Sequence, residues 1–312
     1  MDRMAGEIVI DVQALVKRFG AITAVDSIDL EIRRGEIFGF LGPNGAGKTT
    51  TIRMLCGILR PTSGRATILG YDVIKEPDAV KRQIGYVSQQ FGLYADLTAE
   101  ENLAFYADLY GAEDSAYKED LLTLYGFSDI RRQRAGTLSG GFKQRLALIC
   151  ALSHKPDLIF LDEPTAGVDP VMRKELWDLF YSLTDRGTTL FVTTHYMEEA
   201  ERCHHLAFIF GGRLILKDTP DGIRRSLADR DVFEIRFPYK RTVLERLSTA
   251  QGVETVNQFG STLRVIARKG VHTPEGLYAL LRMPDLPREA VQTAEASIED
   301  VFVNLTQRGR TQ

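Results

Sequence analysis

The stretch GPNGAGKTT, residues 42–50, fits the pattern GxxxxGK[ST] and lies between an apolar run, EIFGFLG (36–42), and a helix-forming run, TTIRMLCGIL (50–59). The order strand, glycine-rich loop, helix is the context in which this pattern binds nucleotide phosphates. The glycines let backbone N–H groups surround the phosphates, Lys48 would reach the β and γ phosphates, and the Thr49 hydroxyl would hold Mg²⁺. We therefore predict a P-loop α/β fold with a nucleotide-binding loop. The loop comprises Gly42, Pro43, Asn44, Gly45, Ala46, Gly47, Lys48, Thr49 and Thr50.

Two further apolar runs, LIFLDEP (158–164) and TTLFVTTH (188–195), also end in polar residues. Apolar runs that alternate with amphipathic helices indicate a parallel sheet, whose ligands bind at the carboxyl ends of the strands. Asp162 is therefore a candidate Mg²⁺ ligand, and Glu163 a candidate for polarising an attacking water. The competing interpretation of these two residues is a solvated acidic pair before a proline turn. His195 ends the third run and is a candidate catalytic residue for the same reason of placement.

Composition and charge restrict the class of protein. The chain has 312 residues, a hydrophobic content of 44% and a formal net charge of -3, so it has no global field that would attract nucleic acid. Cys56, Cys150 and Cys203 show no CxxC spacing, which argues against a metal cluster or a disulfide framework. No window approaches the length of about 20 apolar residues that spans a bilayer. We expect any membrane association to depend on another chain.

A second anion-binding pattern occurs about a hundred residues after the phosphate loop. The stretch LSGGFKQRLAL (138–148) places Ser139, Gly140 and Gly141 at the start of a helix. Unpaired N–H groups and the macrodipole make such a helix start attractive to phosphate. The sequence therefore carries two candidate phosphate sites.

The motifs GPNGAGKTT, LSGGFKQRLAL, LIFLDEPTAGVDP and VTTHYMEEAE, taken in this order, resemble those of an ABC-type ATPase. The resemblance covers roughly the first 225 residues. It implies two nucleotide domains that meet head to tail, so that Ser139, Gly140 and Gly141 of one copy bind the γ phosphate of ATP held by the other. The implied cofactors are ATP and Mg²⁺, and the implied second subunit is most simply an identical copy.

Further assignments follow from the resemblance. Gln89, in IGYVSQQFGLYADLTAEENL, is the implied glutamine-loop residue that contacts Mg²⁺ and water, with Gln90 as the alternative. Phe19 lies where the family stacks an aromatic on adenine; the alternative is a core aromatic between two early strands. Asp169 lies in the loop that contacts the other copy, although an N-cap role would also explain it. The family's signature motif corresponds here to LSGGF (138–142), at the start of the second anion-binding helix. Its fifth position is usually glutamine and is Phe142 in this chain, so any contact from that side chain must be by packing.

The sequence pattern changes after about residue 227. We therefore expect an ABC ATPase domain, residues 1–227, and a small C-terminal α+β accessory domain, residues 228–312. A helical subdomain is expected at about 91–156, with a capping box at Thr98 and Glu101. In the second domain VFEIRF (232–237) and TLRVIA (262–267) have strand patterns, and SIEDVFVNLTQ (297–307) is an amphipathic helix with Ser297 and Asp300 as a cap. The basic clusters near residues 131–134 and 224–225 are most simply solvated faces.

The C-terminal region and the stretch THYMEEAERC resemble exporter ATPases of the daunorubicin-resistance and multidrug type. The resemblance implies an ATP hydrolase that powers efflux through separate integral membrane permease subunits. It implies a peripheral position at the cytoplasmic face of the inner membrane, with membrane association through the permease alone and no nucleic-acid partner. The alternative is a soluble ABC ATPase that acts as an assembly factor.

Overall fold

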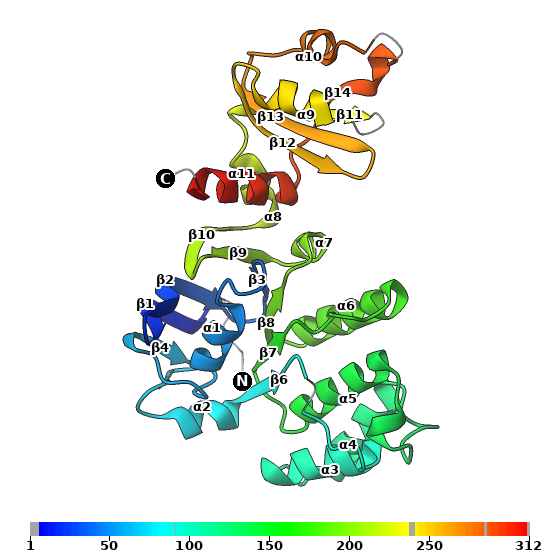
Figure 1. Cartoon of the computed structure of the whole chain (residues 1–312). Helices are drawn as coiled ribbons and strands as arrows, with labels where there is room; N and C mark the ends of the chain where they lie inside the picture. The colour runs from blue at the N-terminus through cyan, green and yellow to red at the C-terminus, as the bar shows by residue number, and fades with distance from the viewer. Residues whose placement is uncertain (1–5, 91, 237–240, 284–285, 311–312) are drawn as a thin grey trace. The chain divides into compact units, whose positions relative to one another are not determined.

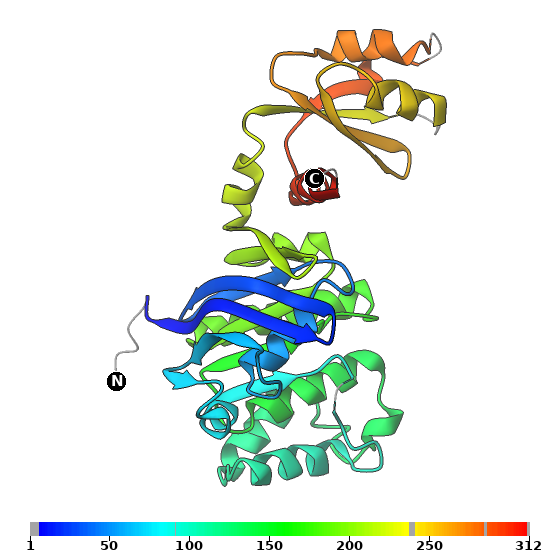
Figure 2. The same ribbon diagram turned by 60° about the vertical axis from the view of Figure 1, so that its left-hand side comes forward.

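A computed structural model describes residues 6–90, 92–236, 241–283 and 286–310; for residues 308–310 it describes the backbone alone. The chain forms two compact units, Met1–Lys217 and Asp218–Gln312. Figures 1 and 2 show the elements of each unit from two directions. The expected helical subdomain begins at about residue 91, and Phe91 itself lies outside the described residues.

The first unit is built around a six-stranded sheet in the order β10-β9-β3-β8-β7-β6. The three predicted apolar strands lie side by side in it, and β3 pairs in parallel with β8, which pairs in parallel with β7. Every residue of these three strands is buried, as continuous apolar runs predict. The strands are β3 (Ile37–Leu41), β6 (Ile84–Val87), β7 (Leu158–Asp162), β8 (Thr189–Thr194), β9 (His205–Phe210) and β10 (Arg213–Asp218).

A second sheet in the same unit has the order β2-β1-β4-β5 and is antiparallel. Its long strands β1 and β2 run side by side, as Figure 2 shows in blue. Their inward side chains share one core with Phe38 and Phe40 of β3. The elements are β1 (Ile8–Phe19), β2 (Ile22–Arg33), β4 (Ser63–Ile68) and β5 (Tyr71–Asp72), with helices α1 (Lys48–Leu55) and α2 (Pro77–Gln83).

Helices follow the strand β6, where the sequence predicted them. They are α3 (Ala99–Leu109), α4 (Ser115–Leu124), the 3₁₀ turn η1 (Ala135–Thr137) and α5 (Gly140–Leu152), and Figure 1 shows α3, α4 and α5 gathered together. The predicted capping box is present, because Thr98 Oγ1 accepts from the Glu101 N–H at 3.2 Å and Glu101 Oε2 accepts from the Thr98 N–H at 2.8 Å. Two further helices, α6 (Pro170–Asp185) and α7 (Met197–Ala200), follow β7 and β8.

The second unit has an antiparallel sheet in the order β12-β13-β11-β14. In both views helices α9 and α10 cover one face of this sheet and α11 covers the other. The elements are α8 (Pro220–Arg225), β11 (Arg230–Arg236), α9 (Arg241–Ser248), β12 (Val253–Phe259), β13 (Thr262–Arg268), α10 (Pro274–Leu281), η2 (Arg288–Ala290), β14 (Val291–Ala294) and α11 (Ile298–Arg310). Strands β12 and β14 had no sequence prediction.

The start of α11 forms the predicted cap. Asp300 Oδ2 accepts from the Ser297 N–H at 2.8 Å, and Ser297 Oγ accepts from the Asp300 N–H at 3.1 Å. Asp300 is fully buried and pairs with Arg264 of β13 at 2.5 Å, so the cap also attaches the helix to the sheet.

The two units divide at residues 217/218, earlier than the expected boundary at 227/228. Helix α8 lies between these positions and contacts α11, which places it with the second unit. The pattern of apolar and polar residues did not reveal this assignment, because the contact between α8 and α11 joins segments far apart in the chain.

Candidate functional site

The phosphate loop connects the end of β3 to the start of α1. Gly47, the residue before the helix, has a φ of +110°, and Gly45 has a φ of +78°, conformations that favour glycine. A Cβ at Gly47 would also lie 2.5 Å from the Ala24 carbonyl oxygen. At Gly42 the limit is space, since a Cβ would lie 2.3 Å from the Ile209 carbonyl oxygen on β9. Backbone packing therefore fixes the shape of the loop.

Gly42→Ala is expected to lower the free energy of unfolding by about 2 kcal/mol, because the added carbon overlaps a backbone oxygen that no rotamer change relieves. Urea denaturation of the two proteins would measure the difference. Gly140→Ala is the control, since no described residue beyond the adjoining turn of the helix lies within 4 Å of a Cβ there. Equal midpoints for Gly42→Ala and the parent protein would contradict the packing described for the loop.

Lys48 is buried at the start of α1 and points back into the loop. Its Nζ donates to the Gly42 carbonyl at 2.8 Å and to the Pro43 carbonyl at 3.2 Å. The same Nζ lies 3.0 Å from Glu163 Oε1, and the two side chains are 4% and 9% exposed. The lysine ammonium and the Glu163 carboxylate therefore face each other directly at the loop.

Asp162 and Thr49 meet at the carboxyl end of β7. Asp162 is 2% exposed, and its Oδ1 accepts from Thr49 Oγ1 at 3.3 Å and from Thr193 Oγ1 at 2.7 Å. Thr193 lies directly opposite Asp162 in the parallel register of β7 and β8. No role was predicted for Thr193. The signal for it was its place two residues before His195, in an apolar run predicted to belong to the same parallel sheet as β7.

Glu163 adopts a left-handed backbone conformation, with a φ of +51°. Its N–H donates to Thr193 Oγ1 at 2.9 Å, so the neighbouring strand β8 holds the turn. Non-glycine residues in this region carry a backbone cost of about 1–3 kcal/mol and cluster at functional sites. This backbone turn directs the Glu163 carboxylate towards Lys48.

Two further predicted residues surround the Glu163 carboxylate. Gln89 Nε2 donates to Glu163 Oε2 at 3.1 Å. His195 Nδ1 lies 3.3 Å from the same oxygen but makes no hydrogen bond, although the nitrogen is buried. A pocket of about 380 Å³ opens at this point. It is lined by Ala24, Asn44, Gly45, Gly47, Lys48, Thr49, Thr50, Gln89 and Glu163.

Other predicted residues lie outside this pocket lining. Phe19 ends β1 and is 49% exposed, so the core-aromatic interpretation is wrong; Lys17 Nζ lies 5.0 Å from its ring centroid. Asp169 caps α6 by accepting from the Val171 and Met172 N–H groups, both at 3.0 Å. The capping role proposed for Asp169 is therefore present in the structure.

Ser139 caps α5 and Gly140 is the first residue of the helix. Gly140 is exposed, and a Cβ there would meet nothing within 4 Å, so no contact with the described part of the chain requires a glycine. Phe142 packs edge-on against Phe127, with ring centroids 5.7 Å apart, and the Arg145 guanidinium lies 5.5 Å from its ring centroid. The signature phenylalanine thus anchors the helix start inside its own subdomain.

Three features of the described residues bear on other functions. No group of three or more His, Cys, Asp or Glu side chains there could hold a metal ion. The three cysteines are free and buried, and burial raises the pKa of the Cys150 and Cys203 thiols. In that same portion of the chain no helix combines the length and the apolar character needed to cross a bilayer.

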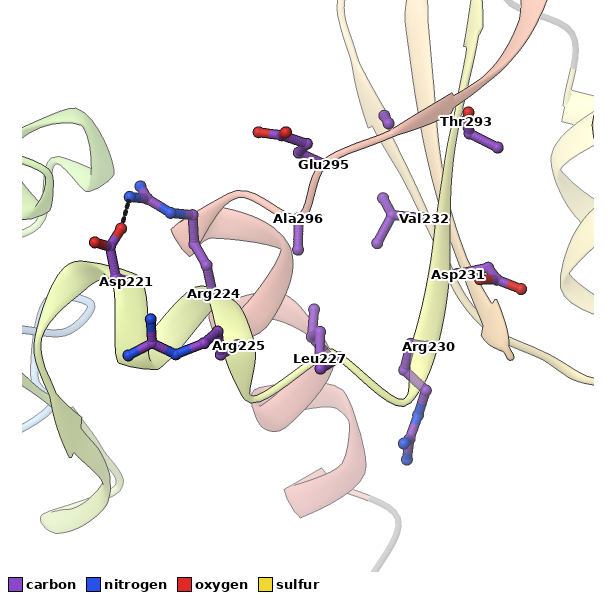
Figure 3. A pocket seen from close by; sticks show the side chains of 12 residues that line it. Asp221, Arg224, Arg225, Leu227, Arg230, Asp231, Val232, Thr293, Glu295 and Ala296 are labelled. Atoms are coloured by element: carbon purple, nitrogen blue, oxygen red, sulfur yellow. Dashed lines mark hydrogen bonds and ion pairs between the residues drawn. The ribbon is translucent and has the colours of Figure 1, made fainter. Parts of the chain in front are cut away.

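A separate pocket of about 410 Å³ lies in the second unit. Figure 3 shows that Arg224 reaches Asp221, while the charged groups of Arg225 and Arg230 point away from the apolar side chains Leu227 and Val232. The arginines near this pocket therefore do not converge on a common point.

The fold and the geometry around Lys48 and Glu163 define a P-loop nucleotide-binding protein of the ATPase class. The ABC transporter family model matches residues 25–166. A probable multidrug ABC transporter ATP-binding protein of Escherichia coli, YbhF, is 45% identical over 72% of this chain; the chain spans 39% of that relative's length. The daunorubicin/doxorubicin resistance ATP-binding protein DrrA of Streptomyces peucetius is 37% identical over 95% of this chain and 92% of its own.

Three further matches, one relative and two solved structures, agree with this family. A Nod factor export ATP-binding protein of Paraburkholderia xenovorans is 37% identical over 97% of this chain and 98% of its own length. The solved structure of an ATP-binding subunit of an ABC transporter has a TM-score of 0.65 and 30% identity, over 70% of this chain and 93% of its own. A cassette solved as a dimer with ADP and phosphate has a TM-score of 0.62 and 26% identity, over 67% of this chain and 98% of its own.

The chain belongs to the ABC transporter family, in which such cassettes are the ATP-binding, ATP-hydrolysing subunits of transport systems. Its relatives are named as ATP-binding proteins of multidrug and exporter-type transporters. The family and the fold class predicted from the four ordered motifs are therefore confirmed.

Proposed function

We propose that this chain hydrolyses ATP between its own phosphate loop and the signature helix of a second copy, and so powers export through separate membrane subunits. The observation that carries the proposal is the position of Glu163, which contacts Lys48 at 3.0 Å and Gln89 at 3.1 Å at the mouth of the phosphate-loop pocket. Release of phosphate from ATP by the purified chain, with and without Mg²⁺, tests it. No release under either condition would overturn it.

The oxygen atoms at the end of β7 suit Mg²⁺. Asp162 and Thr49 supply a carboxylate and a hydroxyl in contact with each other, and Mg²⁺ prefers oxygen ligands while keeping positions for phosphate and water. The protein offers too few acidic ligands here to bind the ion by itself, so the ion would arrive with the nucleotide. When bound, it would neutralise charge on the β and γ phosphates. Gln89 is the proposed third protein ligand.

Glu163 is the proposed general base. Its carboxylate is paired with Lys48, and the γ phosphate would compete for the lysine. The carboxylate released from this pair would accept a proton from the attacking water. His195 and Gln89 flank the same oxygen atoms and would orient the water and the γ phosphate.

The exposed start of α5 supports the two-copy arrangement. Gly140 leaves open space at the N–H groups of the helix start, where a phosphate held by another copy could approach. Ser139, Gly140 and Gly141 would complete the site in trans, and Asp169 would contact the other copy. The exposed ring of Phe19 is available to stack on adenine.

The membrane partner is proposed to dock on the surface formed by Tyr94, Phe105 and Leu109. These side chains are 49%, 40% and 67% exposed, and the rings of Tyr94 and Phe105 contact each other with centroids 4.7 Å apart. Exposed apolar side chains that lie together mark interaction sites. The docking surface follows Gln89 in the chain, so partner movement would reach the nucleotide site by a short path.

Tyr94→Ala and Leu109→Ala are expected to reduce the amount of co-purified membrane partner several-fold, because each removes apolar area from the docking surface. Quantitative mass spectrometry of the gently solubilised complex would measure the ratio of partner to ATPase. Leu124→Ala is the matched control, since Leu124 is an equally apolar side chain, 58% exposed, on the neighbouring helix α4. An unchanged ratio in both variants would place the docking surface elsewhere.

Export of drugs or other amphipathic compounds is the proposed direction and cargo. Relatives named for daunorubicin resistance and for Nod factor export match nearly the whole chain, including its second unit. The chain would lie at the cytoplasmic face of the inner membrane, held there by permease subunits. Purification from gently solubilised membranes should yield a multi-span partner in stoichiometric amount; recovery with only soluble proteins would contradict this placement.

A further inference from the structure

Helices α6 and α7 begin next to two residues of the proposed site, Asp169 and His195. Arg173 lies in the first turn of α6, where its N–H donates to the Asp169 carbonyl at 2.9 Å. Glu198 and Glu199 lie in α7, which begins two residues after His195. A contact between α6 and α7 would therefore join the loop of Asp169 to the histidine.

Arg173 makes this contact in three ways. Its guanidinium pairs with Glu198, lies with Nε 3.8 Å from Glu199 Oε1, and places its central carbon 4.4 Å from the ring centroid of Tyr196. The last distance is within the range of a cation–π interaction. The Tyr196 ring in turn packs on the His195 ring, with centroids 4.1 Å apart and planes tilted by 37°. Arg173, Tyr196 and His195 thus form a continuous row.

The burial of Glu199 makes the positive charge of Arg173 important to α7. Glu199 is 1% exposed, and both of its carboxylate oxygens lack a hydrogen bond. A buried carboxylate needs a nearby positive charge, and its removal leaves an uncompensated charge. Helix α7 has four residues and no side-chain cap, so its own hydrogen bonds hold it weakly. The guanidinium therefore holds α7 in place through charge.

The histidine itself has little to fix it. His195 Nδ1 is buried, has no hydrogen bond, and lies 3.3 Å from Glu163 Oε2. Its ring orientation depends on packing against Tyr196, and the position of Tyr196 depends on Arg173 and on α7. A displacement of this ring by about 1 Å is large enough to impair catalysis strongly.

We infer that Arg173 is a positioning residue: it holds His195 in register with Glu163 through Tyr196 and α7, and links the histidine to the loop of Asp169. This inference rests on the proposed ATP hydrolysis. Movement of α6, which begins at the loop that would contact the second copy, would then move His195. Assembly of the two-copy site and alignment of the histidine would be one event.

Arg173→Leu is expected to lower kcat for ATP hydrolysis by about 10- to 100-fold while the KM for ATP changes less than about 2-fold, because the phosphate loop is untouched. Arg173→Lys should recover part of the activity, since it restores the charge without the planar stacking group. Tyr196→Leu should lower kcat as Arg173→Leu does, because it removes the ring that lies between Arg173 and His195. Thermal melting of each variant checks that the fold is intact.

A double-mutant cycle separates positioning from general stability. In a His195→Ala background, Arg173→Leu should cause little further loss, whereas a purely structural arginine would cause the same fold-loss in both backgrounds. Arg34→Leu is the matched control. Arg34 is similarly buried and pairs with Glu7 and Asp157 at the opposite end of β3, so its loss should not lower kcat selectively. Additive losses, or a kcat unchanged in Arg173→Leu, would overturn the inference.

A second measurement does not require hydrolysis. In protein labelled with ¹⁵N-histidine, Arg173→Leu should shift the imidazole NMR signals of His195 and leave those of His154 and His272 in place. An unshifted His195 signal would overturn the inference even if the enzyme is active. Absence of ATP hydrolysis by the parent protein, with a shifted His195 signal, would instead overturn the proposed function and leave the contact established.

Discussion

Glu163→Gln is expected to reduce ATP hydrolysis by about 10²- to 10⁴-fold while ATP still binds, because the amide has nearly the same shape but cannot accept the proton of the attacking water. The substitution also removes the charge that pairs with Lys48. The lysine is then free for the phosphates, so nucleotide affinity should hold or increase. Phosphate release and equilibrium binding of ATP measure the two effects separately.

The same variant should accumulate as an ATP-bound dimer, since the nucleotide that joins the two copies is no longer consumed. Light scattering with and without ATP would measure this. The matched control is Glu36→Gln, which removes a carboxylate that lies 2.6 Å from His205 Nδ1, before the start of β3 and away from the phosphate loop. Control activity should match that of the parent. A monomer at ATP concentrations well above the dissociation constant would argue against the two-copy site.

Gly140→Asp is expected to abolish ATP-dependent dimerisation and to lower hydrolysis about 100-fold, as the loss of a transition-state donor group does. The aspartate places a negative charge where the γ phosphate of the other copy would approach. Folding should not suffer, because a Cβ at Gly140 meets nothing within 4 Å and an acidic residue suits a helix N-terminus. Binding of ATP to the monomer should be unchanged.

Light scattering and phosphate release are the measurements for Gly140→Asp, and Ser115→Asp is its control. Ser115 occupies the first position of α4, so the control adds the same charge at an equivalent place on another helix. Full activity in Gly140→Asp would show that the start of α5 does not bind phosphate in trans. Equal loss in both variants would indicate a general effect of added charge.

Local patterns were sufficient to predict much of the fold and of the candidate site. The three apolar strands, the phosphate loop and the helix caps at Thr98, Asp169 and Ser297 are each encoded by contiguous residues whose chemistry does not depend on distant partners. Strands β12 and β14 were missed for the opposite reason. Each is short or mixed in polarity, and its strand state depends on pairing with β13 or β11.

The sequence by itself determined the class of this protein, because strand, loop and helix must adjoin in the chain to bind a phosphate, and because Asp162 and Glu163 end one strand. Only the tertiary structure decided which side chains meet. Thr49 contacts Asp162 across 113 residues, and Arg173 reaches Glu198 through the packing of two helices. Such contacts follow from the order of strands in the sheet, which brings together the ends of segments that the sequence keeps apart.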